Sequence, residues 1–210
     1  MKKNGMFITF EGVEGSGKTT QIKLLKEKLE IEGYEVFLTR EPGGTIISEK
    51  IRKILLDPEN NEMASLTELL LYYASRAQHL YEKIVKAKNE GKIVLCDRFS
   101  DSTLAYQGYG RGLDKEIIKQ LTKMVEQGNK PDLTILIDID PEIGLVRAKK
   151  VSENKIGDRL EQEKMEFHKK VWNGYKEIAK VNQKRIVTID GNIDIKTISE
   201  EIKKEVFKRV

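Results

Sequence analysis

Five short apolar segments alternate with longer amphipathic ones along this chain. The apolar segments lie at residues 6–11, 35–40, 92–97, 133–139 and 186–190. Apolar runs of this length are typical of strands that are buried on both faces, as in a parallel sheet. Helical patterns separate the runs, and this alternation places helices on both faces of such a sheet. We therefore predict an α/β fold with a five-stranded parallel sheet, formed by residues 1–210 as one domain.

The polar residues between these runs predict where several helices begin and end. Ser65 and Glu68 have the spacing of a capping box, so a helix is expected from Ser65 to about Asn89. Asp114 is expected to cap the next helix, which ends at Gly128. The last segment places four apolar residues on one helical stripe: Ile195, Ile198, Ile202 and Val206.

A glycine-rich segment directly follows the first apolar run. Residues 12–19 fit the pattern G-x-x-x-x-G-K-[ST], between a predicted strand and an amphipathic helix. The backbone N–H groups of such a loop and of the following helix form a cradle for anions. Lys18 is expected to reach the β- and γ-phosphates of a nucleoside triphosphate, and Thr19 to hold Mg²⁺. The residues expected to bind the nucleotide are Gly12, Val13, Glu14, Gly15, Ser16, Gly17, Lys18 and Thr19.

Charged side chains follow two other predicted strands. Arg40 and Arg98 each lie where a strand ends, and ligands of open parallel sheets bind beyond these carboxyl ends. The forked guanidinium group suits phosphate, so the two arginines predict a second anion beside the phosphate loop. Asp97 precedes Arg98 and is expected to hold Mg²⁺ through water or to orient Arg98; a purely structural carboxylate is the alternative.

One helical stripe in the segment after residue 65 carries a charge. Leu69, Tyr72, Arg76 and Leu80 share one face of the predicted helix. A buried charge is costly without a partner, so Arg76 either forms an internal ion pair or extends its guanidinium group to solvent. A third possibility is that Tyr72 stacks on a flat ring while Arg76 donates to the edge of that ring. The residues leave these alternatives open.

Two further segments are candidates for contact with substrates. Residues 101–112 are rich in short hydrogen-bonding side chains and glycines, and their position after Asp97 and Arg98 favours substrate contact over an ordinary loop. Residues 147–159 carry five basic and two acidic side chains, a net charge of +3. This segment is either a solvated charged surface or a mobile basic lid over phosphates. Its charged residues are Arg147, Lys149, Lys150, Glu153, Lys155, Asp158 and Arg159.

Composition and charge indicate which partners and which compartment to expect. The net charge of +4 over 210 residues is too small to indicate a nucleic-acid partner. The single cysteine, Cys96, lies in an apolar run and is expected to be a buried, reduced side chain. No signal peptide is expected, and no apolar run approaches the ~18 residues of a membrane span. These features favour the cytoplasm. His79 and His168 lie in helical patterns and are expected to be ordinary residues.

Several stretches, taken together, resemble the thymidylate kinase family. Arg-Glu-Pro-Gly-Gly-Thr at 40–45 and Ala-Tyr-Gln-Gly at 105–108 are specific to this family among phosphate-loop kinases. The resemblance covers residues 7 to about 190 and implies the P-loop NTPase fold of nucleoside monophosphate kinases. The matching stretches are residues 10–20, 39–45, 71–78, 97–99, 102–108 and 158–161.

The resemblance implies roles for the residues that recognise a base and a sugar. Arg76 would donate to thymine O4, and Tyr72 would stack on the ring. Thr103 would bond the N3 edge of thymine, with Gln107 nearby. Tyr106 would pack under the sugar and disfavour a ribose 2′-hydroxyl.

It also implies which residues surround the phosphate of dTMP. Arg40 and Arg98 would hold this phosphate, and Arg52 would lie at the edge of the pocket. Glu14 and Asp97 would lie near the sugar, the phosphate and the metal.

One position in the phosphate loop identifies the type within the family. Where some thymidylate kinases carry an arginine, this chain has Gly15, as in the type typical of bacteria, in which lid arginines act instead. The resemblance also implies a homodimer built from helices that pack across a two-fold axis. The residues expected to act in catalysis are Lys18, Arg98, Asp97, Glu14, Arg147 and Arg159.

The expected reaction is ATP + dTMP → ADP + dTDP with Mg²⁺. A kinase for another nucleoside monophosphate or small acceptor, and a nucleotide-binding module without catalysis, are the alternatives. A GTPase switch is a further alternative, because residues 129–132 fit the pattern N-K-x-D. They precede a predicted strand instead of following one, however, and the chain contains no D-x-x-G.

Overall fold

The protein contains a five-stranded parallel sheet, seen in a computed structural model that describes residues 5–151 and 157–210. The strand order is β2-β3-β1-β4-β5, and each neighbouring pair is parallel. The predicted fold class is confirmed, and each strand agrees with its predicted range to within one residue at either end. The strands are β1 Met6–Glu11, β2 Val36–Arg40, β3 Ile93–Asp97, β4 Leu133–Asp138 and β5 Ile186–Asp190.

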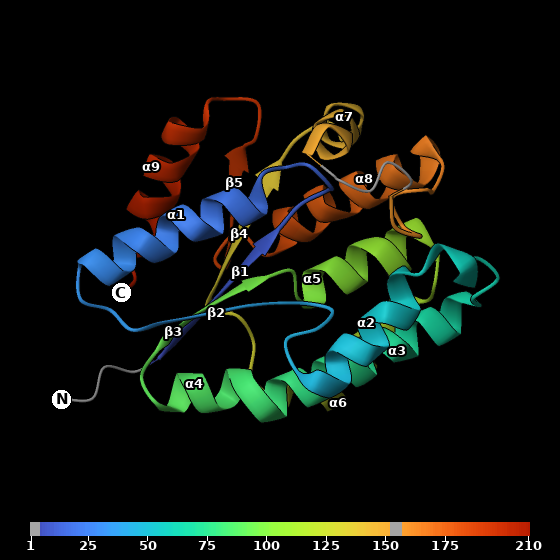
Figure 1. Cartoon of the computed structure of the whole chain (residues 1–210), viewed down its shortest axis with the longest axis horizontal. Coiled ribbons are helices and arrows are strands. Elements are labelled where there is room, and N and C mark those ends of the chain that lie inside the picture. The colour runs from blue at the N-terminus through green and yellow to red at the C-terminus, as the bar shows by residue number, and fades with distance from the viewer. Residues whose placement is uncertain (1–4, 152–156) are drawn as a thin grey trace.

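Helices cover both faces of this sheet (Figure 1). Helices α1 and α9 lie on one face, and the other helices of the core pack on the opposite one. Three single-turn or π-helical segments, η1 to η3, lie among the α-helices. The helical segments are α1 Lys18–Ile31, α2 Ile46–Leu56, η1 Pro58–Asn60, α3 Ser65–His79, η2 Leu80–Ile84, α4 Val85–Asn89, α5 Ser100–Thr103, η3 Leu104–Gly110, α6 Lys115–Glu126, α7 Pro141–Val151, α8 Met165–Val181 and α9 Ile195–Phe207.

The apolar runs are continuous because the sheet is buried on both faces. In β1, Ile8 and Phe10 pack with α1 and α9, whereas Phe7 packs with η2 and α4 on the other face. Successive side chains of a strand alternate between faces, so an unbroken apolar run supplies both layers of the core. The predicted stripe of α9 is confirmed at Ile198, Ile202 and Val206, which all lie in the core, but not at Ile195, which is 60% exposed at the start of the helix. Among the described residues, no helix has the length and apolar character needed to cross a membrane.

Two predicted helix starts had different outcomes. Asp114 caps α6 as predicted, because its carboxylate accepts a hydrogen bond from the Glu116 amide at 2.8 Å. The capping box at Ser65 is wrong: Ala64 is the residue before α3, and no side chain caps the helix. Glu68 is instead fully buried and paired with arginines from elsewhere in the chain. A tertiary ion pair has replaced the local contact that the spacing suggested.

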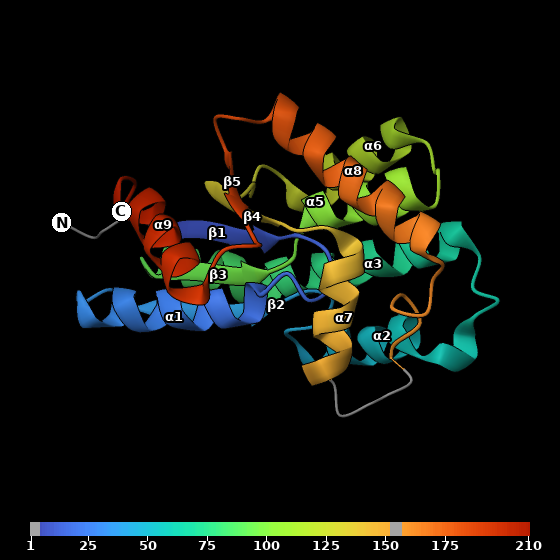
Figure 2. The same cartoon turned by 90° about the horizontal axis from the view of Figure 1, so that it is seen from above.

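Helix α7 packs directly on the phosphate loop (Figure 2). Gly15 has a φ of +66°, and a Cβ atom placed on it would lie 1.9 Å from the Gly144 carbonyl oxygen. A Cβ atom on Gly144, inside α7, would lie 2.3 Å from the Glu14 carbonyl oxygen. Neither contact leaves room for a side chain, so two glycines allow the helix to approach the loop this closely.

Substitution of Gly144 tests this packing. Alanine normally stabilises a helix interior by about 1 kcal/mol relative to glycine. In Gly144→Ala, the clash with the Glu14 backbone should instead destabilise the fold by about 1–3 kcal/mol and weaken ATP binding. Urea unfolding and ATP titration measure the two effects. Val146→Ala, at an exposed position of the same helix, is the control. Unchanged or increased stability of Gly144→Ala would contradict the account.

Candidate active site

The phosphate loop has the backbone of an anion cradle. Gly12, Gly15 and Gly17 all have positive φ values, which other residues rarely adopt. Helix α1 follows at Lys18, and no side chain caps its first turn. The first amides of α1 therefore point toward the loop without an internal acceptor, as anion binding requires.

Lys18 folds back over this loop. Its Nζ donates to the carbonyl oxygens of Gly12 and Val13 at 3.0 and 2.9 Å, and to Ser16 Oγ at 3.2 Å. Burial and the positive charge of Arg98 lower the pKa of Lys18 to about 8, although Asp97 and Glu14 act in the other direction. A bound phosphate would favour the charged form of Lys18 and oppose this shift.

The residues expected to hold the metal lie together. Thr19 Oγ1 donates to Asp97 Oδ2 at 3.0 Å, which joins the start of α1 to the end of β3. Mg²⁺ prefers oxygen ligands and takes one or two carboxylates beside nucleotide phosphates. A hydroxyl and one carboxylate next to the phosphate loop fit this preference.

Arg98 links the phosphate loop to the neighbouring cleft. It has a φ of +68°, and its guanidinium group donates to the Gly12 carbonyl oxygen at 2.8 Å and to Glu14 Oε1 at 2.7 Å. Burial would lower the pKa of Arg98, but its interactions with Tyr106 and Glu14 more than offset this, so the pKa is raised well above its ordinary value. Burial likewise opposes ionisation of Glu14, yet Arg98 and Lys18 hold its pKa below the usual value. Both groups are therefore charged.

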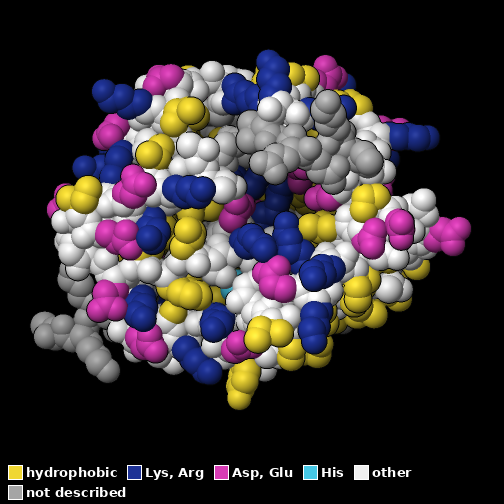
Figure 3. Space-filling view, viewed as in Figure 1, with side chains coloured by type: hydrophobic (Ala, Val, Ile, Leu, Met, Phe, Trp, Pro, Cys, Tyr) yellow, Lys and Arg dark blue, Asp and Glu magenta, His cyan; other side chains and the backbone are white. Residues whose placement is uncertain are grey.

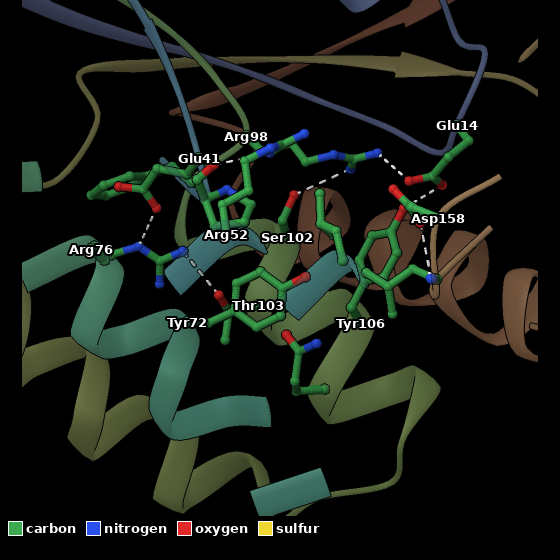
Figure 4. A pocket seen from close by; sticks show the side chains of 15 residues that line it. Glu14, Glu41, Arg52, Tyr72, Arg76, Arg98, Ser102, Thr103, Tyr106 and Asp158 are labelled. Atoms are coloured by element: carbon green, nitrogen blue, oxygen red, sulfur yellow. Dashed lines mark hydrogen bonds and ion pairs between the residues drawn. The ribbon is translucent and has the colours of Figure 1, made fainter. Parts of the chain in front are cut away.

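A cleft opens beside Arg98 at the carboxyl end of the sheet (Figure 4). It encloses about 490 Å³, its open mouth included, and three arginines line it, so we call it the arginine cleft. Residues from α2, α3, α5 and η3 meet here with residues from the loop after β2. The lining residues are Glu14, Glu41, Pro42, Arg52, Leu56, Tyr72, Arg76, Arg98, Phe99, Ser102, Thr103, Tyr106, Gln107, Asp158 and Leu160.

Arg76 lies at the inner end of the arginine cleft and is 1% exposed. Its Nε donates to Glu41 Oε2 at 2.7 Å and its Nη2 to Thr103 Oγ1 at 2.9 Å (Figure 4). The internal ion pair that the sequence left as one alternative is therefore present. The third nitrogen, Nη1, is buried and has no hydrogen-bond partner. An unsatisfied donor of a charged group is costly, so Nη1 is a candidate donor to a ligand in the cleft that Arg76 lines.

The ion pair of Arg76 is anchored in the core. Glu41 Oε1 also lies 3.0 Å from His79 Nδ1, and His79 Nε2 lies 2.7 Å from Thr39 Oγ1. Burial opposes ionisation of Glu41, but Arg76 and His79 hold its pKa below the usual value. His79 is a buried core residue, in agreement with the ordinary role predicted for it.

The segment from α5 into the π-helical η3 supplies the opposite wall. Thr103, Tyr106 and Gln107 all line the arginine cleft. Tyr106 donates from its hydroxyl to Glu14 Oε2 at 2.6 Å, and Gln107 Nε2 donates to Glu68 Oε1 at 2.8 Å. Tyr72 lies in the cleft beside them, and burial raises its pKa above the ordinary value.

Three predicted site residues lie outside both the arginine cleft and the phosphate loop with its metal-binding residues. Arg40 pairs with Glu49 at 3.0 Å on the surface, and Arg147 Nη1 donates to the Gly191 carbonyl oxygen at 2.9 Å. Arg159 is buried, with its Nη2 2.5 Å from Glu68 Oε2. Lys149 and Lys150 are exposed on α7, whereas Glu153 and Lys155 of the predicted lid lie outside the described residues.

Four carboxylates of the site region had no site role in the sequence prediction: Glu11, Glu41, Glu68 and Asp158. Glu11 is fully buried and accepts from the Phe99 amide at 2.8 Å; burial and the charge of Asp101 raise its pKa to about 7. Glu41 and Asp158 both lie within the stretches that resemble the thymidylate kinase family, next to Arg40 and Arg159. No local pattern marks which arginine each of them faces.

Residues 129–132, which fit the GTPase pattern N-K-x-D, lie at the amino ends of the strands, whereas the phosphate loop lies at the carboxyl ends. Asp132 precedes β4, and its Oδ2 accepts from the Phe7 amide at 2.8 Å, near the start of β1. The phosphate loop follows the end of β1, so the length of a strand separates the two. This placement argues against a role for residues 129–132 in binding the base of a nucleotide on that loop.

A parallel sheet of this order, with a phosphate loop after β1 and an arginine-lined cleft beside it, defines a P-loop kinase of the nucleoside monophosphate type. Residues 10–202 match the family model for thymidylate kinase. The chain belongs to the thymidylate kinase family, as its sequence predicted. Members of this family use ATP as the phosphate donor.

Relatives support this assignment over almost the whole chain. A thymidylate kinase from Pelobacter propionicus is 53% identical over 207 residues, which cover 97% of this chain and 94% of the relative. One from Maridesulfovibrio salexigens is 49% identical over 209 residues, which cover 98% and 96%. The crystal structure of thymidylate kinase from Ehrlichia chaffeensis is similar with a TM-score of 0.79 at 41% identity, over 97% of this chain and 99% of that one.

The lowered pKa of Lys18 predicts how ATP binding depends on pH. Phosphate binding needs the protonated amine, and this proton leaves the free protein at a pKa of about 8. Affinity for ATP should be constant below pH 8 and fall above it by up to about tenfold per unit. Titrations at several pH values measure this.

Lys18→Met is the matched control. It should bind ATP weakly at every pH and show no break near pH 8. An affinity of the unaltered protein that stays constant up to about pH 10, near the ordinary lysine pKa, would contradict the lowered pKa.

Proposed function

We propose that this protein transfers the γ-phosphoryl group of ATP to dTMP and that Mg²⁺ assists this reaction. The observation that carries the proposal is the buried, unpaired Nη1 of Arg76 in a cleft adjoining the phosphate loop. Arg98 contacts both regions, since it lines the cleft and donates to Gly12 of the loop. A donor at the inner end and positive charge nearer the loop suit a nucleoside monophosphate with a carbonyl on its base.

Thymine fits the polar groups at the inner end. Its O4 atom is an acceptor and its N3–H group a donor. Arg76 Nη1 supplies a donor to O4, and Thr103 and Gln107 offer oxygen atoms that can accept from N3–H. Tyr72 supplies a flat face beside them. A site of this kind rejects a base with the opposite pattern because buried groups would remain unpaired.

The middle of the cleft suits the sugar and the phosphate. Tyr106 is 4% exposed and bonded to Glu14, so its ring can form a fixed wall under a deoxyribose. Arg98 and Arg52 line the cleft and carry the positive charge for the phosphate of dTMP. Arg40 is also predicted to hold this phosphate. It pairs with Glu49 and does not line the arginine cleft, so its contact with the phosphate stays a prediction.

The reaction needs charge neutralisation more than proton transfer. The second pKa of a phosphate monoester is about 6, so dTMP is mostly a dianion at neutral pH and needs no general base. Lys18 and Arg98 offset the repulsion between the two phosphates and hold them in line. Thr19 and Asp97 would hold Mg²⁺, which neutralises charge on the nucleotide phosphates.

The chain is proposed to act as one kinase domain with a lid over residues 147–159. Among the lid cations that the structure describes, Arg147 lies on α7, which rests on the phosphate loop through Gly144, and its Nη1 donates to the Gly191 carbonyl oxygen. Arg159 is held in a buried ion pair with Glu68, so direct contact with the transferred phosphoryl group would require this pair to open. A cytoplasmic location and the lack of a nucleic-acid partner stay predictions.

A panel of acceptors tests the function. ADP release would be measured with ATP and Mg²⁺ in the presence of dTMP, dUMP, dCMP, UMP, AMP or GMP, and with no acceptor. We expect rapid release with dTMP, slower release with dUMP, and little with the others. A different preferred acceptor would refute the proposed base site, and release without any acceptor would favour an NTPase.

Arg76→Lys tests the role of the buried donor. Lysine keeps the positive charge beside Glu41 but cannot donate in three directions from a rigid plane. The KM for dTMP should rise about 10- to 100-fold, as expected for a lost hydrogen bond from a charged group, while the Kd for ATP stays unchanged. Steady-state kinetics and ATP titration measure both constants.

Arg185→Lys is the matched control, since Arg185 is paired with Asp101 at 2.7 Å and lies outside the arginine cleft. It should leave the KM for dTMP unchanged. An equal loss of dTMP and ATP binding in Arg76→Lys would show that Arg76 is a structural residue only.

The predicted homodimer has a suitable surface. Apolar residues form an exposed stripe along α3, and a second stripe with Ile117 and Met124 runs along the neighbouring α6. Figure 3 shows hydrophobic side chains gathered over the helices at the lower right. Two copies related by a two-fold axis could bury these stripes against each other. The residues of the α3 stripe and its continuation are Leu66, Leu70, Ala74, Ala77 and Tyr81.

Leu70→Asp tests this surface. Leu70 is 49% exposed at the middle of the stripe, and a charge there should convert a dimer to a monomer without loss of fold. Light scattering coupled to size-exclusion chromatography gives the mass. Ile195→Asp, at the exposed start of α9, should remain dimeric. A dimer of unchanged stability in Leu70→Asp would place the interface elsewhere.

A further inference from the structure

Glu68 is a buried charge that the proposed reaction does not use directly. It lies on α3, is fully buried, and receives three side chains from distant parts of the chain. Gln107 Nε2 donates to Oε1 at 2.8 Å, while Arg111 Nη2 and Arg159 Nη2 reach Oε2 at 3.1 and 2.5 Å. Glu68 therefore joins the wall of the arginine cleft to the buried Arg159 and the half-buried Arg111.

The surroundings of Glu68 keep it ionised. Burial opposes ionisation, but hydrogen bonds from Arg111 and Gln107 and the charges of both arginines hold its pKa below the usual value. An ionised carboxylate can only accept hydrogen bonds. Every group that contacts Glu68 must therefore present a donor to it.

This requirement fixes the orientation of the Gln107 amide. The two ends of a glutamine amide have nearly the same shape, and only the hydrogen-bond network decides between them. Because Nε2 must face Glu68, the other end of the amide is the carbonyl oxygen, which can only accept. Gln107 lines the arginine cleft together with Arg76 and Thr103.

We propose that Glu68 is a positioning residue for base selection: by fixing the Gln107 amide it makes this position of the arginine cleft an acceptor and not a donor. The proposal rests on the function proposed above, in which the cleft holds thymine. Thymine and uracil offer N3–H to such an acceptor and O4 to Arg76. Cytosine has an acceptor at N3 and an amino group at C4. The Gln107 oxygen would then face another acceptor, and Arg76 would face another donor.

The same carboxylate ties base selection to the segment that ends the predicted lid. The Arg159 amide donates to the Leu56 carbonyl oxygen at 3.1 Å, and Arg159 Nε donates to the Leu55 carbonyl oxygen at 2.8 Å. Its neighbour Asp158 lines the arginine cleft. Arg159 thus acts as a counter-ion that holds Glu68 ionised, and the catalytic contact that the sequence predicted for it stays a prediction.

Glu68→Gln tests the proposal. A glutamine at position 68 can offer either end of its amide, so Gln107 becomes free to turn. The ratio of kcat/KM for dTMP over dCMP should fall about tenfold or more, because a turned Gln107 amide could donate to N3 of cytosine. The ratio for dTMP over dUMP should not change, because these bases share the same edge. If dCMP is not turned over, its inhibition constant against dTMP replaces kcat/KM.

Two variants separate positioning from general stability. Glu163→Gln removes the other carboxylate on Arg111, 2.5 Å from Nη1, without touching Gln107, and should leave both ratios unchanged. Glu68→Gln should also have no further effect on the dTMP to dCMP ratio in a Gln107→Leu background. A loss of thermal stability with an unchanged dTMP to dCMP ratio would overturn the proposal and leave Glu68 a structural residue.

If Glu68→Gln does not fold, the hydrogen bond between Gln107 and Glu68 can be tested in the unaltered protein. The Gln107 side-chain amide resonances of the unaltered protein, assigned with Gln107→Leu, should include one proton protected from exchange by the bond to Glu68. Rapid exchange of both protons would overturn the proposal. Failure of the proposed function is distinct, because the unaltered protein would then phosphorylate neither dTMP nor dUMP.

Discussion

The arrangement of the site depends on the pairing of arginines with carboxylates, two of these pairs being buried and one half-buried. Arg76 is held by Glu41, Arg98 by Glu14, and Arg159 by Glu68. Removal of one partner from a buried pair costs about 3–5 kcal/mol, so each arginine is confined to one orientation. The guanidinium N–H groups that take no part in these ion pairs are therefore held in fixed positions before a ligand binds. In Arg76 this donor is Nη1, at the inner end of the arginine cleft.

The fold brings these pairs together at one edge of the sheet. The carboxyl ends of β1, β2 and β3 supply the phosphate loop, Glu41 and Arg98, and their parallel register places them side by side. Helix α3 and the π-helical η3 form the opposite wall, which carries the residues that we propose recognise the base. Arg98 contacts both the loop and the cleft, so the two nucleotides would meet at this residue. Such fixed geometry is what phosphoryl transfer between two anions requires.

Much of this could be predicted from the sequence, because local rules govern it. Continuous apolar runs marked the strands, since each is buried on both faces, and the spacing of Gly12, Gly17 and Lys18 marked the phosphate loop. A charge on an apolar helical stripe marked Arg76. Glu68 was misread, because its spacing from Ser65 fits a local cap while its partners, Arg111 and Arg159, are distant in sequence. The close approach of Gly144 to the loop likewise has no local signal.

The central claim is that paired arginines form the site for the acceptor before ATP binds. Calorimetric titration of dTMP into the nucleotide-free protein tests it most directly. We predict that dTMP binds without ATP, that thymidine binds more weakly because it lacks the phosphate that we propose Arg98 holds, and that dCMP binds much more weakly than dTMP. Binding of dTMP only after ATP is added, or equal binding of dTMP and dCMP, would contradict a preformed site selective for thymine.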